Sequence, residues 1–292
     1  MLGLSSARVV GENGIAMQIK RRTLLAGLLA VPAVAGVSLG RVAPARSADF
    51  TARELALRFR SADRAVPDDL SDHDFSYLDL SGLDFKRAVL AGADFYGTDL
   101  LGADLRGADL RDARLDRATI IQTNFTGANL SGVSMSLPTT FVDLAFNTSQ
   151  VATFARADLS EARVLARLYG ADFRGAVLVG ADFSALSAGR ATIASVPYNF
   201  LTGGNFDGAD LRGANFSHAE MNFVSFRGAD LRDANFAKSA LVKADFASAK
   251  LDGAIFDGAD LRDTVLARGA GLISPTTGGP VANVNRPSDQ MR

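Results

Sequence analysis

Histidine, cysteine and clustered carboxylates are the residue types from which most catalytic and metal sites are built. The chain of 292 residues has two histidines, His73 and His218, and no cysteine. Neither histidine lies in a His-Glu pattern with metal-binding spacing, and no Gly-rich phosphate loop ends in Lys-Ser/Thr. The residues therefore predict no catalytic residue, no cofactor and no metal, and they exclude thiol and disulfide chemistry.

The carboxylates are numerous, but they recur at a fixed spacing. A typical unit reads Ala108-Asp109-Leu110-Arg111, with the acid between a small and a large apolar residue. We interpret these acids and the arginines that follow them as a solvated surface that keeps the chain soluble. The sequence accordingly predicts a protein that is not an enzyme.

A period of five residues organises the chain. Large apolar residues occupy every fifth position from Leu70 to Met135 and again from Leu201 to Leu266. The residue two places earlier is small, and the residue between them is polar. Two inward side chains around one outward side chain are typical of a strand, and the Gly or polar pair that follows suits a turn. Each unit of five is therefore expected to form one short side of a coil. The predicted core includes Phe75, Phe95, Leu110, Phe216, Phe236 and Phe256.

These units resemble the A-(D/N)-(L/F)-x-x signature of the pentapeptide repeat family over nearly all of residues 68–268. The resemblance implies an all-β fold, a right-handed quadrilateral parallel β-helix with four units per coil. Counting the units predicts between nine and ten coils within residues 67–268. The signature identifies the fold and leaves function to be argued from a site.

The repeat is interrupted twice, and both interruptions carry aromatic residues. We expect loops at 136–153, with Phe141 and Phe146, and at 194–204, with Tyr198 and Phe200. Insertions in solenoids form loops, often on the binding face. Packing of these loops on the coil is the alternative interpretation. If both loops leave the same wall, the four aromatic side chains form one partner-binding patch.

The N-terminus has the three parts of an export signal. Lys20-Arg21-Arg22 precedes an apolar run, and Ala43-Pro44-Ala45 follows as a cleavage site. The paired Arg21 and Arg22 resemble a twin-arginine signal, which is read by the system that exports folded proteins. We therefore predict a signal peptide at 1–45, with Met17 as an alternative start. Because the apolar run is short for a membrane span, no stable anchor is expected after cleavage.

The predicted location is periplasmic or secreted. Removing residues 1–45 would leave 26 basic and 31 acidic residues, a net charge of −5. Such a mild charge gives no general attraction to nucleic acid. The predicted partner is another protein of the cell envelope.

The two ends of the coil differ in sequence. Residues 46–66 predict a capping helix, in which Thr51 and Glu54 form a capping box and Phe50 and Leu55 a hydrophobic staple. Residues 269–292 are rich in Gly, Pro and Thr and predict a flexible tail. The expected state is a monomer or an end-to-end dimer through the C-terminal coil.

Three functions remain open. The first is a non-enzymatic protein-binding or scaffold module that uses flat walls and two aromatic loops. The second follows from the resemblance, because known family members mimic DNA, bind DNA gyrase and protect against quinolones. An export signal and arginines across the acidic faces argue against it; these are Arg106, Arg111, Arg212, Arg227, Arg232 and Arg262. The third, a β-helix carbohydrate-active enzyme, has the least support.

Replacing Arg21 and Arg22 together by Lys tests the export signal. Because the twin-arginine pathway reads the guanidinium pair, the double variant should stay in the cytoplasm, folded and unprocessed. Cell fractionation with N-terminal sequencing measures this. Undiminished export of the variant would contradict the twin-arginine interpretation.

Overall fold

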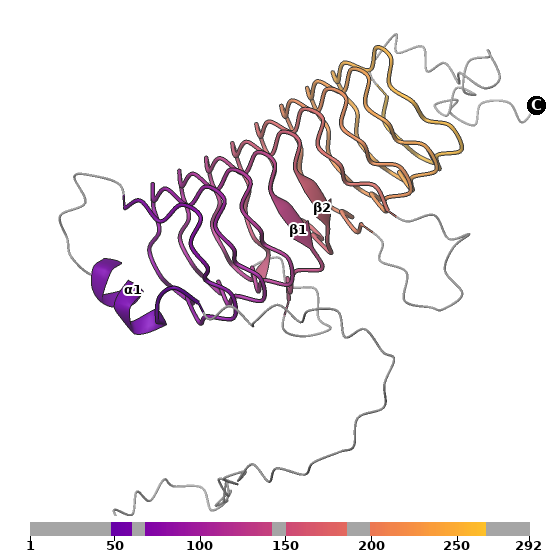
Figure 1. Cartoon of the computed structure of the whole chain (residues 1–292). Coiled ribbons are helices and arrows are strands. Elements are labelled where there is room, and N and C mark those ends of the chain that lie inside the picture. The colour runs from indigo at the N-terminus through magenta and orange to yellow at the C-terminus, as the bar shows by residue number, and fades with distance from the viewer. Residues whose placement is uncertain (1–47, 60–67, 142–149, 186–198, 267–292) are drawn as a thin grey trace, which may run out of the picture. The chain divides into compact units, whose positions relative to one another are not determined.

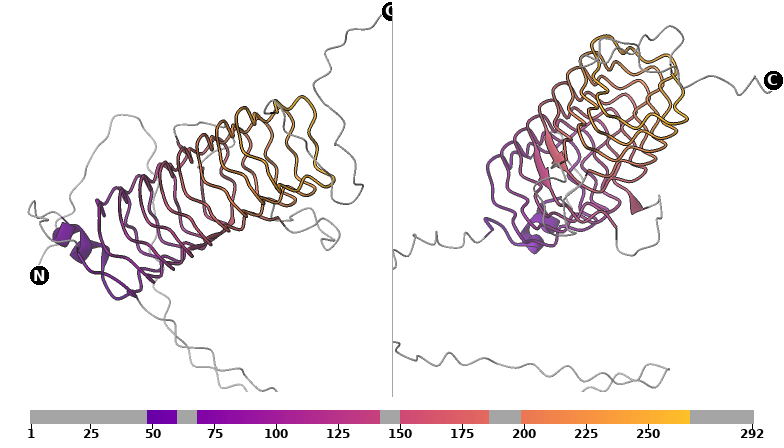
Figure 2. Two further views of the ribbon diagram at one scale, coloured as in Figure 1. Left: turned by 90° about the horizontal axis from the view of Figure 1, so that it is seen from above. Right: turned by 90° about the vertical axis from the view of Figure 1, so that its right-hand side faces the viewer.

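The coil dominates the computed structural model, which describes residues 48–59, 68–141, 150–185 and 199–266. The regular elements of the described residues are one helix, α1 (Ala52–Phe59), and two strands, β1 (Ser134–Ser136) and β2 (Arg163–Leu165). The other rungs are single parallel bridges between neighbouring coils. In Figures 1 and 2 these coils follow one another along one axis, and β1 and β2 lie side by side as adjacent rungs.

The bridges show that the coil has four sides. Asp69 pairs with Val89 and Val89 with Asp109, always in parallel and twenty residues apart. Four successive units of five therefore close one coil, as the resemblance to the pentapeptide repeat family implies. We name the sides walls 1 to 4 after their first large inward residues, Leu70, Phe75, Leu80 and Phe85. Corners 1 to 4 are the turns that follow the walls of the same number.

Opposite walls carry the same kind of core residue. Wall 1 is a stack of leucines, namely Leu70, Leu90, Leu110, Leu130, Leu159, Leu178, Leu211, Leu231 and Leu251. Walls 2 and 4 carry most of the phenylalanines, so that Phe216 stacks on Phe236 at 5.3 Å between ring centroids and meets Phe226 edge to face at 6.4 Å. The predicted core residues Phe75, Phe95, Leu110, Phe216, Phe236 and Phe256 are all buried.

Corners are built from left-handed turns. The N–H of Ala88 donates to the carbonyl of Phe85 at 3.0 Å, and Arg87 between them has φ 57°. A positive φ at this position is typical of a type II turn. The outward Asp or Asn takes part in the corner, as when Asp94 Oδ1 accepts the N–H of Tyr96 at 2.9 Å. The recurring acids therefore satisfy backbone donors in addition to solvating the wall.

The two interruptions of the repeat span fewer residues than the sequence predicted. Residues 136–140 still belong to the coil, because Thr139 pairs with Thr119 and Thr140 is buried, its Oγ1 donating to the carbonyl of Arg167 at 2.7 Å. The expected loop at 136–153 was therefore too wide, since a buried threonine continues the apolar column. The next coil resumes at Thr153, which pairs with Asn124. Residues 142–149 lie outside the described part of the chain.

The second expected loop, 194–204, also ends earlier. Phe200 pairs with Arg167 and Glu220 on wall 3, and Leu201 is fully buried. Residues 186–198 lie outside the described residues. Between the interruptions, one coil is shortened by a residue at corner 2, where Val164 and Leu168 are successive core positions.

A buried amide holds the coil together where the second interruption ends. Asn199 occupies an inward position that elsewhere is usually Ala, and its side chain is fully buried. Its Oδ1 accepts the N–H of Ala166 at 2.7 Å, and its Nδ2 donates to the carbonyls of Val164 at 2.6 Å and Phe183 at 2.7 Å. The side chain thus replaces backbone partners that the interrupted coil cannot supply.

Helix α1 contacts the first coil. Its capping box forms as predicted: the N–H of Thr51 donates to Glu54 Oε2 at 2.7 Å, and Thr51 Oγ1 accepts the N–H of Glu54 at 3.2 Å. Leu55 is fully buried in the same core cluster as the coil. Phe50 stacks on His73, with 5.0 Å between ring centroids. Residues 60–67, the rest of the predicted helix, lie outside the described residues.

Replacing Phe236 by Ala tests the core. Because the ring is fully buried between Phe216 and Phe256, the free energy of unfolding should fall by about 3 to 5 kcal/mol. Urea unfolding measures the change. As a control, Arg232→Ala removes an exposed ion pair with Asp230 and should cost about 1 kcal/mol or less. Equal losses would contradict the inward and outward assignment.

Replacing Asn199 by Ala tests the buried amide. The change leaves the N–H of Ala166 and several carbonyls without the hydrogen bonds that Asn199 provides. The free energy of unfolding should therefore fall by about 1 to 3 kcal/mol. The control is Asn129→Ala, because that side chain only accepts bonds from Ser131 on the outer wall. A loss at Asn199 no larger than at Asn129 in urea unfolding would refute the proposed role.

Candidate interaction surface

Among the described residues, three corners hold an exposed aromatic or aliphatic side chain at a left-handed position that favours Gly. Tyr77, Leu137 and Phe223 have φ of 60°, 54° and 59°, and their side chains are 73%, 52% and 58% exposed. The left-handed conformation costs a non-glycine residue about 1 to 2 kcal/mol. Exposed apolar side chains recover little of this cost by burial. Strain of this kind concentrates at functional sites, so these corners are candidates for binding.

Two of the three residues lie on the same edge. Successive coils place Tyr77, Gly97, Arg117 and Leu137 along corner 2. The ring of Tyr77 lies against Gly97, where an added Cβ would come within 2.9 Å of the ring atoms. Glycine is therefore needed at 97 both for its φ of 66° and for this close approach. Tyr77 also meets Tyr96 edge to face, with 5.4 Å between ring centroids.

An ordered arginine extends the aromatic pair. The guanidinium of Arg114 lies 4.2 Å from the ring centroid of Tyr96 and pairs with Asp94 at 3.3 Å and Asp116 at 2.9 Å. Burial acts to raise the pKa of Asp116, but hydrogen bonds from Arg114, from the Ser134 hydroxyl and from the N–H of Ser136 hold that pKa below its usual value. Arg114 is thus fixed before any partner arrives. We name the Tyr77 patch for its members, Tyr77, Tyr96, Arg114, Arg117 and Leu137.

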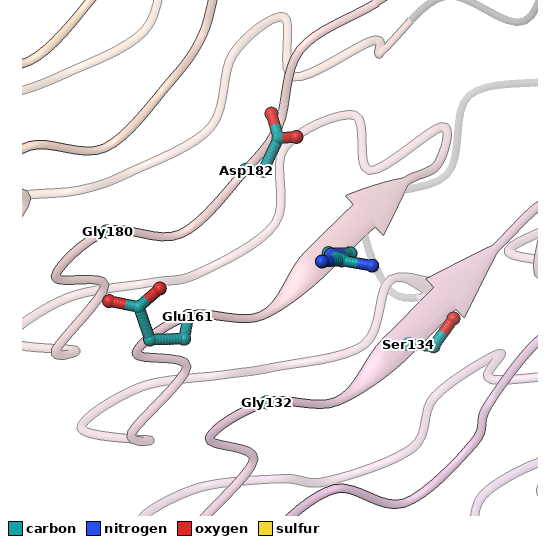
Figure 3. A pocket seen from close by; sticks show the side chains of 6 residues that line it. Gly132, Ser134, Glu161, Gly180 and Asp182 are labelled. Atoms are coloured by element: carbon teal, nitrogen blue, oxygen red, sulfur yellow. The ribbon is translucent and has the colours of Figure 1, made fainter.

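A shallow depression adjoins the patch on wall 2. Its volume is about 510 Å³, and it is lined by Gly132, Ser134, Glu161, Arg163, Gly180 and Asp182. Figure 3 shows the side chains of Ser134, Glu161 and Asp182 projecting from three successive coils. Ser134 also belongs to the network of Arg114, because its hydroxyl donates to Asp116 at 2.8 Å. The depression is open and polar, which suits contact with a protein surface better than enclosure of a substrate.

Of the four aromatic residues predicted to bind a partner, the structure describes Phe141 and Phe200 and places both at wall 3. Phe200 is a rung of wall 3 and not a loop residue; it stacks on Tyr169 at 5.4 Å, and Arg167 lies 5.7 Å from its ring centroid. Phe141 is half-buried directly after Thr140 at the end of a wall 3 rung. Phe146 and Tyr198 lie outside the described residues.

The sequence-based prediction did not include the Tyr77 patch, because binding residues were expected only where the repeat is interrupted. Its signal was nevertheless present in the repeat. The second residue of the corner is Gly, Asp, Arg or Lys in most units, and Tyr77 and Leu137 depart from this. A large apolar residue at that position is predictable as exposed and strained.

The arginines across the acidic faces form ion pairs. All six that were noted in the sequence bind an Asp through Nη2 at 2.6–2.8 Å; they are Arg106, Arg111, Arg212, Arg227, Arg232 and Arg262. The hydrogen bonds from Arg111 hold the pKa of Asp109 below its usual value. The arginines offset the charge of these neighbouring carboxylates, so the six pairs do not form a continuous anionic surface.

In the described ranges no group of three or more His, Asp and Glu side chains is arranged to hold a metal ion. No helix there is long and apolar enough to cross a membrane. His73 packs between Phe50 and Phe75, at 5.0 and 6.3 Å between ring centroids.

The repeat places the chain in a known family. Residues 69–112, 99–136, 166–186, 201–233 and 229–266 match the Pentapeptide repeats family, in 8 copies. The chain belongs to the pentapeptide repeat family, whose members form right-handed quadrilateral β-helices. The family is one of structural or binding modules and does not indicate a catalytic activity. No curated protein sequence matches the chain.

Several solved structures resemble it. HetL, a pentapeptide repeat protein involved in heterocyst differentiation regulation from the cyanobacterium Nostoc sp., is 27% identical, with 73% of this chain and 81% of HetL covered and a TM-score of 0.30. QnrB1, a plasmid-mediated fluoroquinolone resistance protein, is 18% identical over 74% of this chain and 89% of QnrB1, with a TM-score of 0.39. A protein of the Arabidopsis thaliana thylakoid lumen is 23% identical over 52% and 67%, with a TM-score of 0.17.

Replacing Tyr77 by Gly tests whether the residue serves stability. The change relieves the left-handed backbone strain, which stabilises the folded state. It also removes the contact with Tyr96 and raises the conformational entropy of the unfolded chain, and both effects destabilise the folded state. The opposing effects should nearly cancel. We expect the free energy of unfolding to change by less than about 1 kcal/mol in urea unfolding. A loss of several kcal/mol would show instead that Tyr77 is a structural residue.

Proposed function

We propose that the protein is a non-enzymatic protein-binding module and that the Tyr77 patch with the adjoining depression is its main contact surface. The observation that carries this proposal is the retention of strained, exposed Tyr77 and Leu137 on one edge. Tyr and Arg are enriched among the residues that dominate binding energy. The patch offers both, with Arg114 already held in place by two carboxylates.

The partner should present an apolar or aromatic surface to Tyr77 and Leu137 and a carboxylate to the depression. We expect a carboxylate on the partner because Arg163 lines the depression. Its guanidinium is exposed on wall 2, and no Asp or Glu of the described residues pairs with it. Arg114, two rungs away on the same wall, is paired with Asp94 and Asp116. A partner carboxylate could therefore bind Arg163 without displacing an existing contact.

The location and the partner's origin rest on the N-terminal sequence. We propose export through the twin-arginine signal at Arg21 and Arg22, cleavage after Ala45, and a partner in the cell envelope. The flat walls and the residues around Phe141 and Phe200 would then provide secondary contacts. The chain would act as a monomer or as an end-to-end dimer.

Gyrase binding by DNA mimicry is not supported by a comparable observation. Such mimicry needs a strongly anionic face, whereas the outward arginines of this chain neutralise neighbouring carboxylates. Carbohydrate processing needs paired acids around a groove, whereas the depression on wall 2 is open and holds an arginine between its acids.

Site-specific crosslinking in the producing cell tests the proposed surface. A photoreactive phenylalanine at position 137 should give one discrete adduct with an envelope protein, identified by mass spectrometry. The same probe at Val177, exposed on wall 1, should not give it. Tyr77→Gly should reduce the adduct at least about tenfold, which corresponds to 1.4 kcal/mol of binding.

The matched control is Phe223→Gly. It relieves the same left-handed strain at corner 3, outside the Tyr77 patch, and should leave the adduct unchanged. Equal adducts from positions 137 and 177, or equal losses in the two glycine variants, would refute the assignment of the surface.

A further inference from the structure

The coil is one residue short beside Leu137. Val164 and Leu168 are successive core positions four residues apart, whereas core positions elsewhere are usually five apart. The residues between them include none with a left-handed backbone. The N–H of Leu137 donates to the carbonyl of Leu165 at 2.8 Å, where β1 and β2 lie side by side (Figure 1). Leu137 therefore faces the shortened corner of the next coil.

The shortened corner has an arginine on each side. Arg163 is the outward residue of wall 2 before the corner, and Arg167 is the outward residue of wall 3 after it. A third arginine, Arg117, lies one coil before Leu137 on the same edge, and its N–H donates to the carbonyl of Ser136 at 2.9 Å. All three arginine side chains are exposed. We name Arg117, Arg163 and Arg167 the arginine triad.

No Asp or Glu of the described ranges forms an ion pair with the arginine triad. The acids nearest in the fold have other contacts. Asp116 pairs with Arg114 at 2.9 Å, Glu161 leans over corner 1 of the next coil, and Asp182 accepts the N–H two residues later at 2.9 Å. The wall holds three like charges near one another, and their repulsion lowers the stability of the free chain.

We propose that the arginine triad binds an acidic segment of the partner protein, in which carboxylates flank an aliphatic side chain that packs on Leu137. This inference rests on the proposed function, because it assigns a chemistry to the partner of the same surface. A guanidinium binds a carboxylate through two parallel hydrogen bonds. Since the triad has no ion pair within the described residues, binding breaks none, and the charges of the two surfaces become complementary.

A protein segment fits this surface better than an anionic membrane does. Asp116 directly precedes Arg117 in the chain, and Asp182 is the rung next to Arg163. The uniform negative charge of a lipid surface would meet these acids as well as the arginines. A protein segment places its carboxylates opposite the arginines alone.

A charge-neutral double variant in the crosslinking experiment tests the proposal. The photoreactive phenylalanine at position 137 is combined with Arg163→Gln and Arg167→Gln in the full chain. The adduct with the envelope protein should fall at least about tenfold, because two of the three arginines that bind carboxylates are lost. Peptide mapping by mass spectrometry should place the crosslink in a segment with Asp or Glu on both sides of an aliphatic residue.

The matched control is Arg87→Gln with Arg156→Gln. These two arginines are also exposed and form no ion pair with an acid of the described residues, but they lie on corner 4 with their side chains over glycines of the next coil. Both double variants change the net charge equally, so the control should leave the adduct unchanged. Cooperative urea unfolding of both variants should show that the coil is folded.

The outcomes separate this inference from the proposed function. If the two double variants change the adduct equally, or if the crosslinked segment has no acidic residues, the acidic segment is wrong while the binding surface stands. An adduct with lipid in place of protein would assign the triad to a membrane surface and overturn the proposal. If position 137 of the otherwise unmodified chain gives no adduct, the proposed function is wrong, and this inference with it.

Discussion

The constant distance between opposite walls of the coil is the constraint on which the rest of the structure depends. Each side is five residues long, and the ladder between coils holds the backbones at the strand spacing of about 4.8 Å. A core side chain must therefore fit between opposite walls, which the alternation of Leu on wall 1 and Phe on walls 2 and 4 achieves. Extra residues cannot enter a side without moving its core residue outward. The chain accordingly takes insertions and deletions at corners, as between Thr140 and Thr153.

The same constraint limits the chemistry of the surface. Outward residues are spaced by the ladder, and the acids among them are engaged in satisfying the N–H groups of the corner, as Asp94 does for Tyr96. Arginines two residues later neutralise several of these acids, as Arg111 does for Asp109. The outer surface of a wall therefore carries paired charges and acids bonded to the backbone. It displays side chains at fixed spacing to a partner but does not enclose a substrate.

Departures from the repeat therefore carry the functional information. Tyr77 and Leu137 keep a strained backbone and an exposed apolar side chain on one edge. Asn199 is a departure of the opposite kind, because its buried amide repairs the ladder beside an interruption. The strained corners at Tyr77 and Leu137 lower stability without adding buried contacts. The buried amide of Asn199 raises stability. This difference separates candidate binding residues from structural ones.

By itself, the sequence determined the unit of five, the inward and outward positions and the capping box at Thr51, because each depends on local periodicity or short-range hydrogen bonds. The number of sides followed from the resemblance to the pentapeptide repeat family. The sequence could not determine the loop limits, since a polar Thr140 or a Phe200 at an outward rung looks like a break in an apolar column. Nor could it bring Tyr77, Tyr96 and Arg114 into one patch. Residues twenty apart become neighbours only when the coil closes, so the tertiary structure alone decided which outward side chains meet.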